Sequence, residues 1–189
     1  MRRDPRIDVE ESPSVYRPSD DTDLLLQALA VSPGQRFLEV GTGTGLIALH
    51  AVVTSVAVAT DVNPRAVTLA RRNAVRNRLP LSVVRCDLMS GVQGPFDVVA
   101  FNPPYLAGNG HDDLERAWLG GPTGSEVAIR FLEGLPRVLA PHGRAYVCLS
   151  RQNEAARASA DDHFHVDVVA RKQLFFETLE ILHLRRGLK

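Results

Sequence analysis

Residues 36–51, RFLEVGTGTGLIALHA, decide the fold of this chain. A short apolar strand, Arg36 to Val40, leads directly into a loop with glycine at alternate positions, and a helical segment, Leu46 to Ala51, follows. Glycine lets a backbone turn tightly and approach a ligand closely, and the start of a helix offers free N–H groups. The stretch therefore favours a nucleotide-type site in an α/β sheet, although Gly-x-Gly-x-Gly alone is a weak signal.

Acidic residues follow the next two predicted strands. The strand Val56 to Thr60 ends at Asp61, twenty residues after Gly41, where a carboxylate can accept both hydroxyls of a ribose. The strand Leu81 to Cys86 ends at Asp87, which is placed to accept from an adenine amino group. An Asx turn explains Asp87 equally well. Strand, glycine loop, helix, strand and acid together indicate a nucleotide-like ligand.

The apolar run Phe96 to Ala100 delivers the segment Phe101-Asn102-Pro103-Pro104-Tyr105 to the same predicted edge. Two adjacent prolines fix φ twice and remove two donors, so this segment predicts a rigid turn. One Asn amide and one aromatic ring in such a turn could hold a planar group by hydrogen bonds and a ring face. A plain strand-terminating loop is the alternative.

The rest of the sequence predicts an alternation of elements closed by a hairpin. Residues 1–19 predict an extended arm, and residues 20–189 the main domain. Acidic residues and Thr22 crowd the start of a helix at Asp20, where capping explains most of them and a ligand role for Thr22 is the alternative. Asn63-Pro64 predicts a helix start, and a glycine-containing loop at 108–124 predicts a functional segment. The remaining predicted elements are a helix from Ser125 to Leu139 distorted by Pro136, a turn at 141–143, a strand from Arg144 to Ser150, a helix from Arg151 to Ala160, and strands Phe164 to Ala170 and Leu174 to Leu184 joined at residues 171–173.

Composition favours a single soluble domain. The 189 residues include 22 basic and 22 acidic side chains, so no global field draws the chain to nucleic acid or an anionic membrane. The first ten residues lack the apolar core of a signal peptide, and no apolar run reaches the roughly 18 residues of a membrane helix. These features predict a cytoplasmic protein without membrane contact. Cys86 and Cys148 predict reduced, buried thiols.

The histidines predict no metal site. They are scattered along the chain, and only His163 and His165 are close together. On a strand such a pair is more typical of two polar residues on one face than of metal ligands.

The conjunction of these motifs resembles the class I S-adenosylmethionine-dependent methyltransferases. The motifs match in order and spacing: Glu39-x-Gly41-x-Gly43-x-Gly45, Asp61, Asp87-Leu88 and Asn102-Pro103-Pro104-Tyr105. Two further elements, Tyr16-x-Pro18-Ser19-Asp20-Asp21-Thr22 and Gly120-Gly121-x-x-Gly124, are similar to those of the short HemK-related enzymes that methylate the glutamine of Gly-Gly-Gln in translation release factors. The resemblance covers residues 12–186. It implies a Rossmann-like, seven-stranded, mostly parallel sheet with an antiparallel C-terminal hairpin and helices on both faces.

The resemblance also implies roles for individual residues. Glu39 and the backbone of Gly41, Gly43 and Gly45 would hold the methionine part of S-adenosyl-L-methionine, and Thr22 would close over it. Asp61 would hold the ribose, and Asp87 with the Leu88 amide the adenine. Asn102 would touch both the cofactor and the acceptor, and the acceptor would also meet Pro103, Pro104 and Tyr105. Methyl transfer would leave S-adenosyl-L-homocysteine as product.

The chemistry explains the composition of the turn. An amide nitrogen is a poor nucleophile, so the enzyme must orient it toward the methyl group. The Asn102 side-chain oxygen and the Pro103 carbonyl could each accept one N–H of the acceptor amide, and Tyr105 would pack on its flat face. Hydrogen bonds that strengthen as the nitrogen becomes positive favour the transition state.

Two alternatives stay open at this point. The same turn occurs in enzymes that methylate an exocyclic amine of adenine or guanine in RNA or DNA, but those must flip a base and hold phosphates. A cofactor-binding module without catalysis is the other alternative, which the intact Asn102 disfavours. Longer HemK relatives carry an amino-terminal helical domain that this chain lacks, which points to the archaeal and eukaryotic type or to a bacterial paralogue. The archaeal and eukaryotic members work with a small zinc-binding activator subunit, so such a partner is expected as well.

Overall fold

The chain forms one seven-stranded sheet in the order β3-β2-β1-β4-β5-β7-β6. The computed structural model describes residues 1–112 and 114–187. Asp113 of the predicted functional loop and the last two residues of the predicted domain lie outside them. The strands are β1 (Arg36–Val40), β2 (Val56–Asp61), β3 (Ser82–Arg85), β4 (Phe96–Phe101), β5 (Leu139–Ser150), β6 (Phe164–Gln173) and β7 (Thr178–Arg186).

The first five strands are parallel, and β7 is antiparallel to β5 and β6. The helices are α1 (Asp20–Ala28), α2 (Leu46–Val52), α3 (Pro64–Asn77), α4 (Glu126–Val138) and α5 (Glu154–His163), with a short 3₁₀ turn η1 (Glu115–Ala117). The predicted mostly parallel sheet with a C-terminal hairpin is therefore confirmed.

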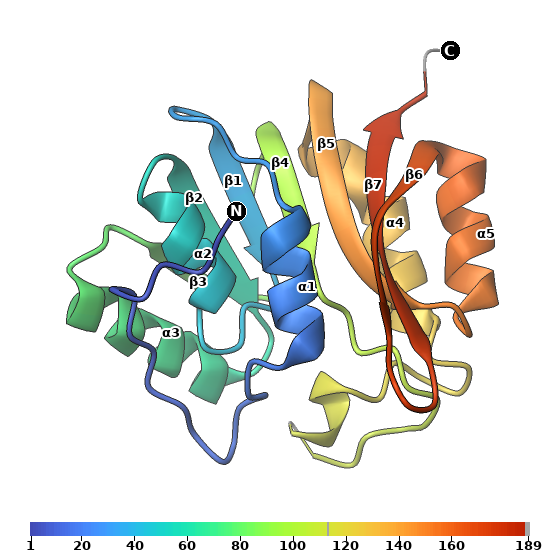
Figure 1. Ribbon diagram of the computed structural model, residues 1–189, viewed down its shortest axis with the longest axis horizontal. Coiled ribbons are helices and arrows are strands. Elements are labelled where there is room, and N and C mark those ends of the chain that lie inside the picture. Colours follow the sequence, from blue (N-terminus) through green and yellow to red (C-terminus); the bar gives the residue numbers. More distant parts are fainter. Residues whose placement is uncertain (113, 188–189) are drawn as a thin grey trace.

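Both faces of the sheet are buried, because successive side chains of the central strands point to opposite sides. Phe37 of β1 packs against α1 and α2, whereas its neighbour Leu38 packs against α4. Val98 and Val99 of β4 alternate in the same way. Helices α1, α2 and α3 cover one face and α4 and α5 the other (Figure 1).

The amino-terminal arm lies against the first face. The Met1 ammonium donates to the Leu26 carbonyl at the end of α1, at 2.8 Å. Asn73 of α3 accepts from the Glu10 backbone N–H at 2.8 Å and donates to the Glu10 carbonyl at 3.0 Å. The boundary between arm and domain at residue 20 stays a prediction, although α1 does begin at Asp20.

Several expected boundaries were wrong. Strand β5 begins at Leu139, so residues 141–143 lie in the strand, and a register shift opposite β4 accommodates them. Helix α5 begins at Glu154 rather than Arg151, because the Arg151 N–H donates to the Thr178 carbonyl and so extends the sheet. His163 ends this helix and is not in a strand with His165.

The hairpin connection also differs from the expectation. Residues 171–173 are paired with β7, and the connection is residues 174–177, which we call the hairpin tip. The polar residue Arg171 stays in the strand because its guanidinium donates to the buried Glu180 at 2.7 Å. Leu174, Phe175 and Phe176, expected in a strand, instead form the turn.

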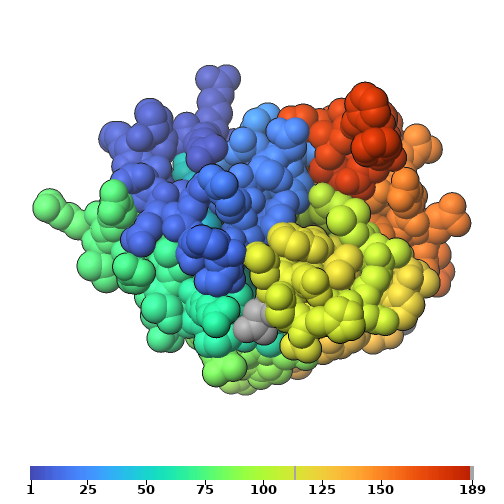
Figure 2. Space-filling model, turned by 90° about the horizontal axis from the view of Figure 1, so that it is seen from below, coloured from blue at the N-terminus to red at the C-terminus, as the bar shows by residue number. Residues whose placement is uncertain are grey.

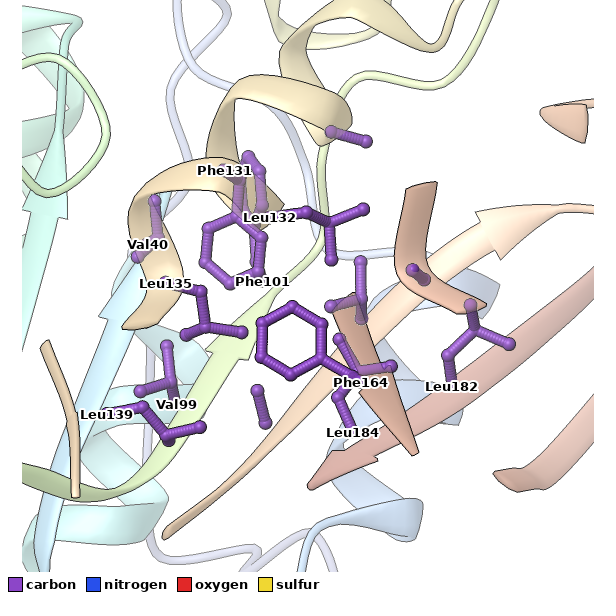
Figure 3. Packing of buried hydrophobic residues seen from close by; sticks show 14 of the residues in the cluster. Val40, Val99, Phe101, Phe131, Leu132, Leu135, Leu139, Phe164, Leu182 and Leu184 are labelled. Carbon is purple, nitrogen blue, oxygen red and sulfur yellow. The ribbon is translucent and has the colours of Figure 1, made fainter. Parts of the chain in front are cut away.

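Two aromatic rings support the end of β4. Phe101 and Phe131 are both buried, with ring centroids 4.8 Å apart (Figure 3). Phe131 comes from α4, so this contact fixes the last residue of β4 against the second face. Asn102 follows directly.

Replacing Phe131 by Ala is expected to lower the free energy of unfolding by about 3–5 kcal/mol, since it leaves a cavity in a close-packed core. Chemical denaturation measures this. The control is Val75→Ala on α3, where the side chain is 79% exposed, and a change within about 0.5 kcal/mol is expected. Equal effects of the two substitutions would contradict this account of the core.

Candidate functional site

The carboxyl ends of the parallel strands meet at one edge of the sheet. Val40 of β1 lies level with Thr60 of β2 and with Phe101 of β4. The loops that follow these strands line a cavity of about 450 Å³, within the range of roughly 300–1,000 Å³ that is usual for small-molecule sites. The cavity wall includes Thr22, Glu39, Gly41, Gly43, Asp61, Asp87, Leu88, Asn102, Pro103, Pro104 and Tyr105. Of the predicted site residues, Gly45 alone is not in this wall.

The glycine loop is held close to its neighbours. Gly41 has a φ of 65°, and a side chain there would meet the Phe101 ring at 3.0 Å. The Gly43 N–H donates to the Asp61 carboxylate at 2.9 Å. Gly45 has a φ of 85° and packs on Ala70 of α3, so it positions α2. The backbone amides of the loop thus reach the cavity in a fixed arrangement.

Glu39 is the buried acid of the site. Its side chain accepts from the Thr42 hydroxyl at 2.5 Å and from the Ala48 N–H at 2.9 Å. Burial raises the pKa of this carboxyl to about 8, and the nearby Asp61 charge adds to the rise. At neutral pH the folded, ligand-free chain therefore holds a proton here. A positively charged ligand group beside it would favour the ionised form.

The turn after β4 leaves one acceptor unused. Asn102 Oδ1 is buried, and among the described residues it has no hydrogen-bond partner. The Tyr105 carbonyl accepts from Asn153 Nδ2 at 2.8 Å, and the same amide reaches the Gly124 carbonyl at 3.2 Å. A side chain at Gly124 would lie 2.4 Å from the Tyr105 oxygen. The predicted rigid turn is thus also held from outside, by the loop at 108–124 and by Asn153.

Asp87 and Leu88, which follow β3, form a more exposed part of the cavity wall. Asp87 is exposed and forms an ion pair with Arg130 of α4. Leu88 has a φ of 48°, and its carbonyl accepts from the Thr60 hydroxyl at 2.8 Å. The bond from Thr60 fixes the segment that follows β3 beside the end of β2.

The sequence matches known proteins over most of its length. The methyltransferase small domain family matches residues 14–176. A protein of Methanocaldococcus jannaschii with the provisional name protein N5-glutamine methyltransferase is 34% identical, over 95% of this chain and 96% of the relative. A release factor glutamine methyltransferase of Deinococcus radiodurans is 33% identical, over 72% of this chain and 53% of that protein.

A solved structure agrees. The Mtq2-Trm112 complex of E. cuniculi, described as methylating the translation termination factor eRF1, contains a chain with a TM-score of 0.74 and 27% identity. The alignment covers 92% of this chain and 99% of that one. This chain belongs to the methyltransferase small domain family. It is an S-adenosylmethionine-dependent methyltransferase.

A cavity residue that sequence reasoning missed connects the amino-terminal arm to the turn after β4. Asp21 is 1% exposed and accepts from the Tyr16 hydroxyl at 2.7 Å and from the Tyr105 hydroxyl at 3.4 Å. Burial, and then the Asp21 charge, raise the pKa of both tyrosines. Asp21 therefore joins the amino-terminal arm to the turn. Its place in a capping cluster concealed this contact, which depends on residues 84 positions apart.

The loop at 108–124 of the methyltransferase reaches the same cavity. Arg116, Ala117, Trp118 and Leu119 line it. The ring centroids of Trp118 and Tyr16 are 6.4 Å apart in an edge-to-face arrangement, so the loop contacts the amino-terminal arm. The Leu106 N–H donates to the Trp118 carbonyl at 2.9 Å. The described part of this loop thus lies at the cavity. That the loop is functional stays a prediction.

Outside the cavity, the described residues show neither a membrane-spanning helix nor a metal-binding cluster. Among residues 1–112 and 114–187, no helix is both long enough and apolar enough to cross a membrane. The described residues also contain no group of three or more His, Cys, Asp and Glu side chains placed to hold a metal ion. Cys86 and Cys148 are free thiols; Cys148 is buried as predicted, whereas Cys86 is only half-buried.

Glu39→Gln is expected to change how stability depends on pH. Between about pH 4.5 and about pH 8 the folded wild type binds a proton at Glu39 that the unfolded chain releases, so its stability falls as pH rises through this window. Gln keeps the acceptor oxygen without this titration. The melting temperature of the variant relative to wild type should therefore rise with pH and level off above about 8.

Thermal unfolding of the ligand-free protein across this window measures the effect. Glu133→Gln, an exposed position on α4, is the control for loss of a carboxylate. A wild-type to Glu39→Gln difference that stays constant with pH would contradict the raised pKa.

Proposed function

We propose that this methyltransferase transfers a methyl group to the side-chain amide nitrogen of a glutamine, in the Gly-Gly-Gln motif of a translation release factor. The observation that carries the proposal is the buried, unpartnered Asn102 Oδ1 in a rigid turn at the cavity. A buried acceptor without a donor costs about 1–3 kcal/mol. An acceptor that holds an N–H of the substrate recovers this cost.

The cavity fits S-adenosylmethionine. Its wall offers close backbone approach at Gly41 and Gly43, and carboxylates at three strand ends, Glu39, Asp61 and Asp87. We assign the methionine part to Glu39 and the glycine loop, the ribose to Asp61, and the adenine to Asp87 and Leu88. Thr22, 8% exposed in the cavity wall, would close the amino-terminal side. The bound molecule supplies an electrophilic methyl group on a sulfonium.

The turn prepares the acceptor nitrogen. Asn102 Oδ1 and the Pro103 carbonyl would each accept one N–H, which directs the nitrogen lone pair away from both and toward the methyl group. Tyr105 would pack on the amide plane. Partial positive charge grows on the nitrogen during transfer, so both hydrogen bonds strengthen in the transition state. The proton can leave after transfer, so these steps require no general base.

A protein acceptor is favoured over a nucleobase. Several relatives of this chain are named for glutamine methylation, and three of them for methylation of a release factor. The 22 basic and 22 acidic residues supply no excess charge for a phosphate backbone. A release factor substrate also places the enzyme in the cytoplasm, where translation ends.

The proposal includes a small partner subunit. We expect it to bind zinc, as the family resemblance implies. The support is the structural relative, which was solved as a complex with Trm112. Strand β3 forms one outer edge of the sheet. Beside it Val62 is 58% exposed, and Val75 of the adjoining α3 is 79% exposed. These two valines lie next to the edge strand, and exposed apolar side chains beside an open strand edge suit a partner strand.

Asn102→Ala is expected to lower kcat on a release factor by about 100-fold or more, the scale of losing one transition-state hydrogen bond. The Kd for S-adenosylmethionine, measured by calorimetry, should change much less. Asn102→Asp, which keeps an acceptor oxygen, should retain more turnover than Asn102→Ala. Near-wild-type turnover of the alanine variant would show that Asn102 does not orient the acceptor.

Ionic strength separates the two acceptor classes. Methylation of a neutral glutamine loop should change little between about 50 and 200 mM salt, whereas a nucleic-acid substrate making several phosphate contacts would lose affinity steeply, by about 10³ or more. The measurement is kcat/KM on purified release factor and on total RNA at each salt concentration. Activity on RNA with a steep salt slope, and none on release factor, would favour the nucleobase instead.

A further inference from the structure

Two phenylalanines at the hairpin tip lie in solvent. Phe175 is 93% exposed and Phe176 is 86% exposed, whereas the other five phenylalanines of the chain are buried. The two rings contact each other edge to face, with centroids 4.8 Å apart. Neither ring contributes to the core or to the cavity wall. An exposed aromatic pair of this kind is typical of an interaction surface.

The backbone beneath the rings is fixed by hydrogen bonds. The Leu174 N–H donates to the Glu177 carbonyl at 2.8 Å, which closes the turn. Gln173 Nε2 donates to the same carbonyl at 3.3 Å, and Gln173 Oε1 accepts from the Thr178 hydroxyl at 2.5 Å. The rings are therefore presented on an ordered turn, so a partner that binds them meets little further cost of ordering the backbone.

The hairpin tip lies at the same edge of the sheet as the cavity. Ser150, the last residue of β5, pairs with Leu179 at the start of β7. Two adjacent residues after β5 then connect the tip to residues 102–105, which we call the acceptor turn. Gln152 Nε2 donates to the Phe176 carbonyl at 3.4 Å, and Asn153 Nδ2 donates to the Tyr105 carbonyl at 2.8 Å.

An exposed apolar residue directly follows the turn. Leu106, which follows Tyr105, is 44% exposed. Figure 2 views the molecule from this edge and shows the tip of the hairpin (red) beside the segments that follow the acceptor turn (yellow-green). The Glu177 charge also contributes to raising the pKa of Tyr105. The aromatic pair is thus continuous with the site where the acceptor enters.

We propose that Phe175 and Phe176 form a docking contact for the folded protein that carries the acceptor glutamine, by packing on an apolar patch outside its glutamine loop. This inference rests on the proposed function. A glutamine side chain alone occupies only the turn at Asn102. A folded substrate must approach this whole edge to place a loop there, and the projecting rings lie on that approach. The contact provides affinity for the substrate and takes no part in the methyl transfer itself.

The test compares two substrates of the full chain: an intact release factor and a short peptide that contains only its Gly-Gly-Gln loop. The double variant Phe175→Ser/Phe176→Ser is expected to raise KM for the intact protein by tenfold or more, with kcat retained. Its kcat/KM for the peptide, and its Kd for S-adenosylmethionine, should stay within about twofold of wild type. Val169→Ser, at a 47% exposed position of the same hairpin, is the matched control and should leave all three values unchanged.

The outcomes separate the two proposals. If wild type, alone and together with the proposed partner subunit, methylates neither the intact protein nor the peptide, the proposed function fails. If wild type methylates both and the double variant keeps its KM for the intact protein, the docking contact is wrong while the function stands. An equal loss on protein and peptide would assign the pair a structural role and overturn the inference. A wild-type dimer that the double variant dissociates in sedimentation would assign the rings to self-association and overturn it too.

Discussion

The site depends on the register of the three central parallel strands. Val40, Thr60 and Phe101 end level with one another, because β1 pairs in parallel with both β2 and β4. Parallel pairing sends all three loops to the same edge, and the order of the sheet places β1 between the other two. A glycine loop, an acid and an amide from separate parts of the chain thus reach one cavity. A slip of one residue would turn every buried side chain of a strand to the other face, so packing on both faces fixes this register.

The turn after β4 is supported by residues from the second half of the chain. Gly124 packs against the Tyr105 carbonyl, and Asn153 donates to it. Beneath the turn, Phe101 rests on Phe131 (Figure 3). An unpartnered acceptor such as Asn102 Oδ1 is tolerated because its surroundings are rigid and cannot move to satisfy it. The proposed function uses this unpartnered oxygen to select an N–H donor.

Asp21 gives the amino-terminal arm a place in the same site. It accepts hydrogen bonds from Tyr16 of the arm and Tyr105 of the turn. Its side chain is almost fully buried and also accepts from the Ser19 hydroxyl and the Thr22 N–H, so its buried oxygens are hydrogen-bonded. The arm, the turn and the loop that carries Trp118 therefore meet at one cavity, although they are distant in sequence.

The sequence by itself determined the fold class and the edge of the sheet that carries the site, because strand, glycine loop, helix and acid follow one another at short range. The same local patterns located α1, α3 and the turn after β4. Local sequence patterns predicted the wrong element boundaries where a tertiary contact decided the structure. Arg171 looked like a turn residue and stays in a strand because it pairs with buried Glu180, which leaves Phe175 and Phe176 exposed at the hairpin tip. Only the tertiary structure could place Asp21 beside Tyr105 and Asn153 behind the turn, since these hydrogen bonds join residues that no sequence spacing relates.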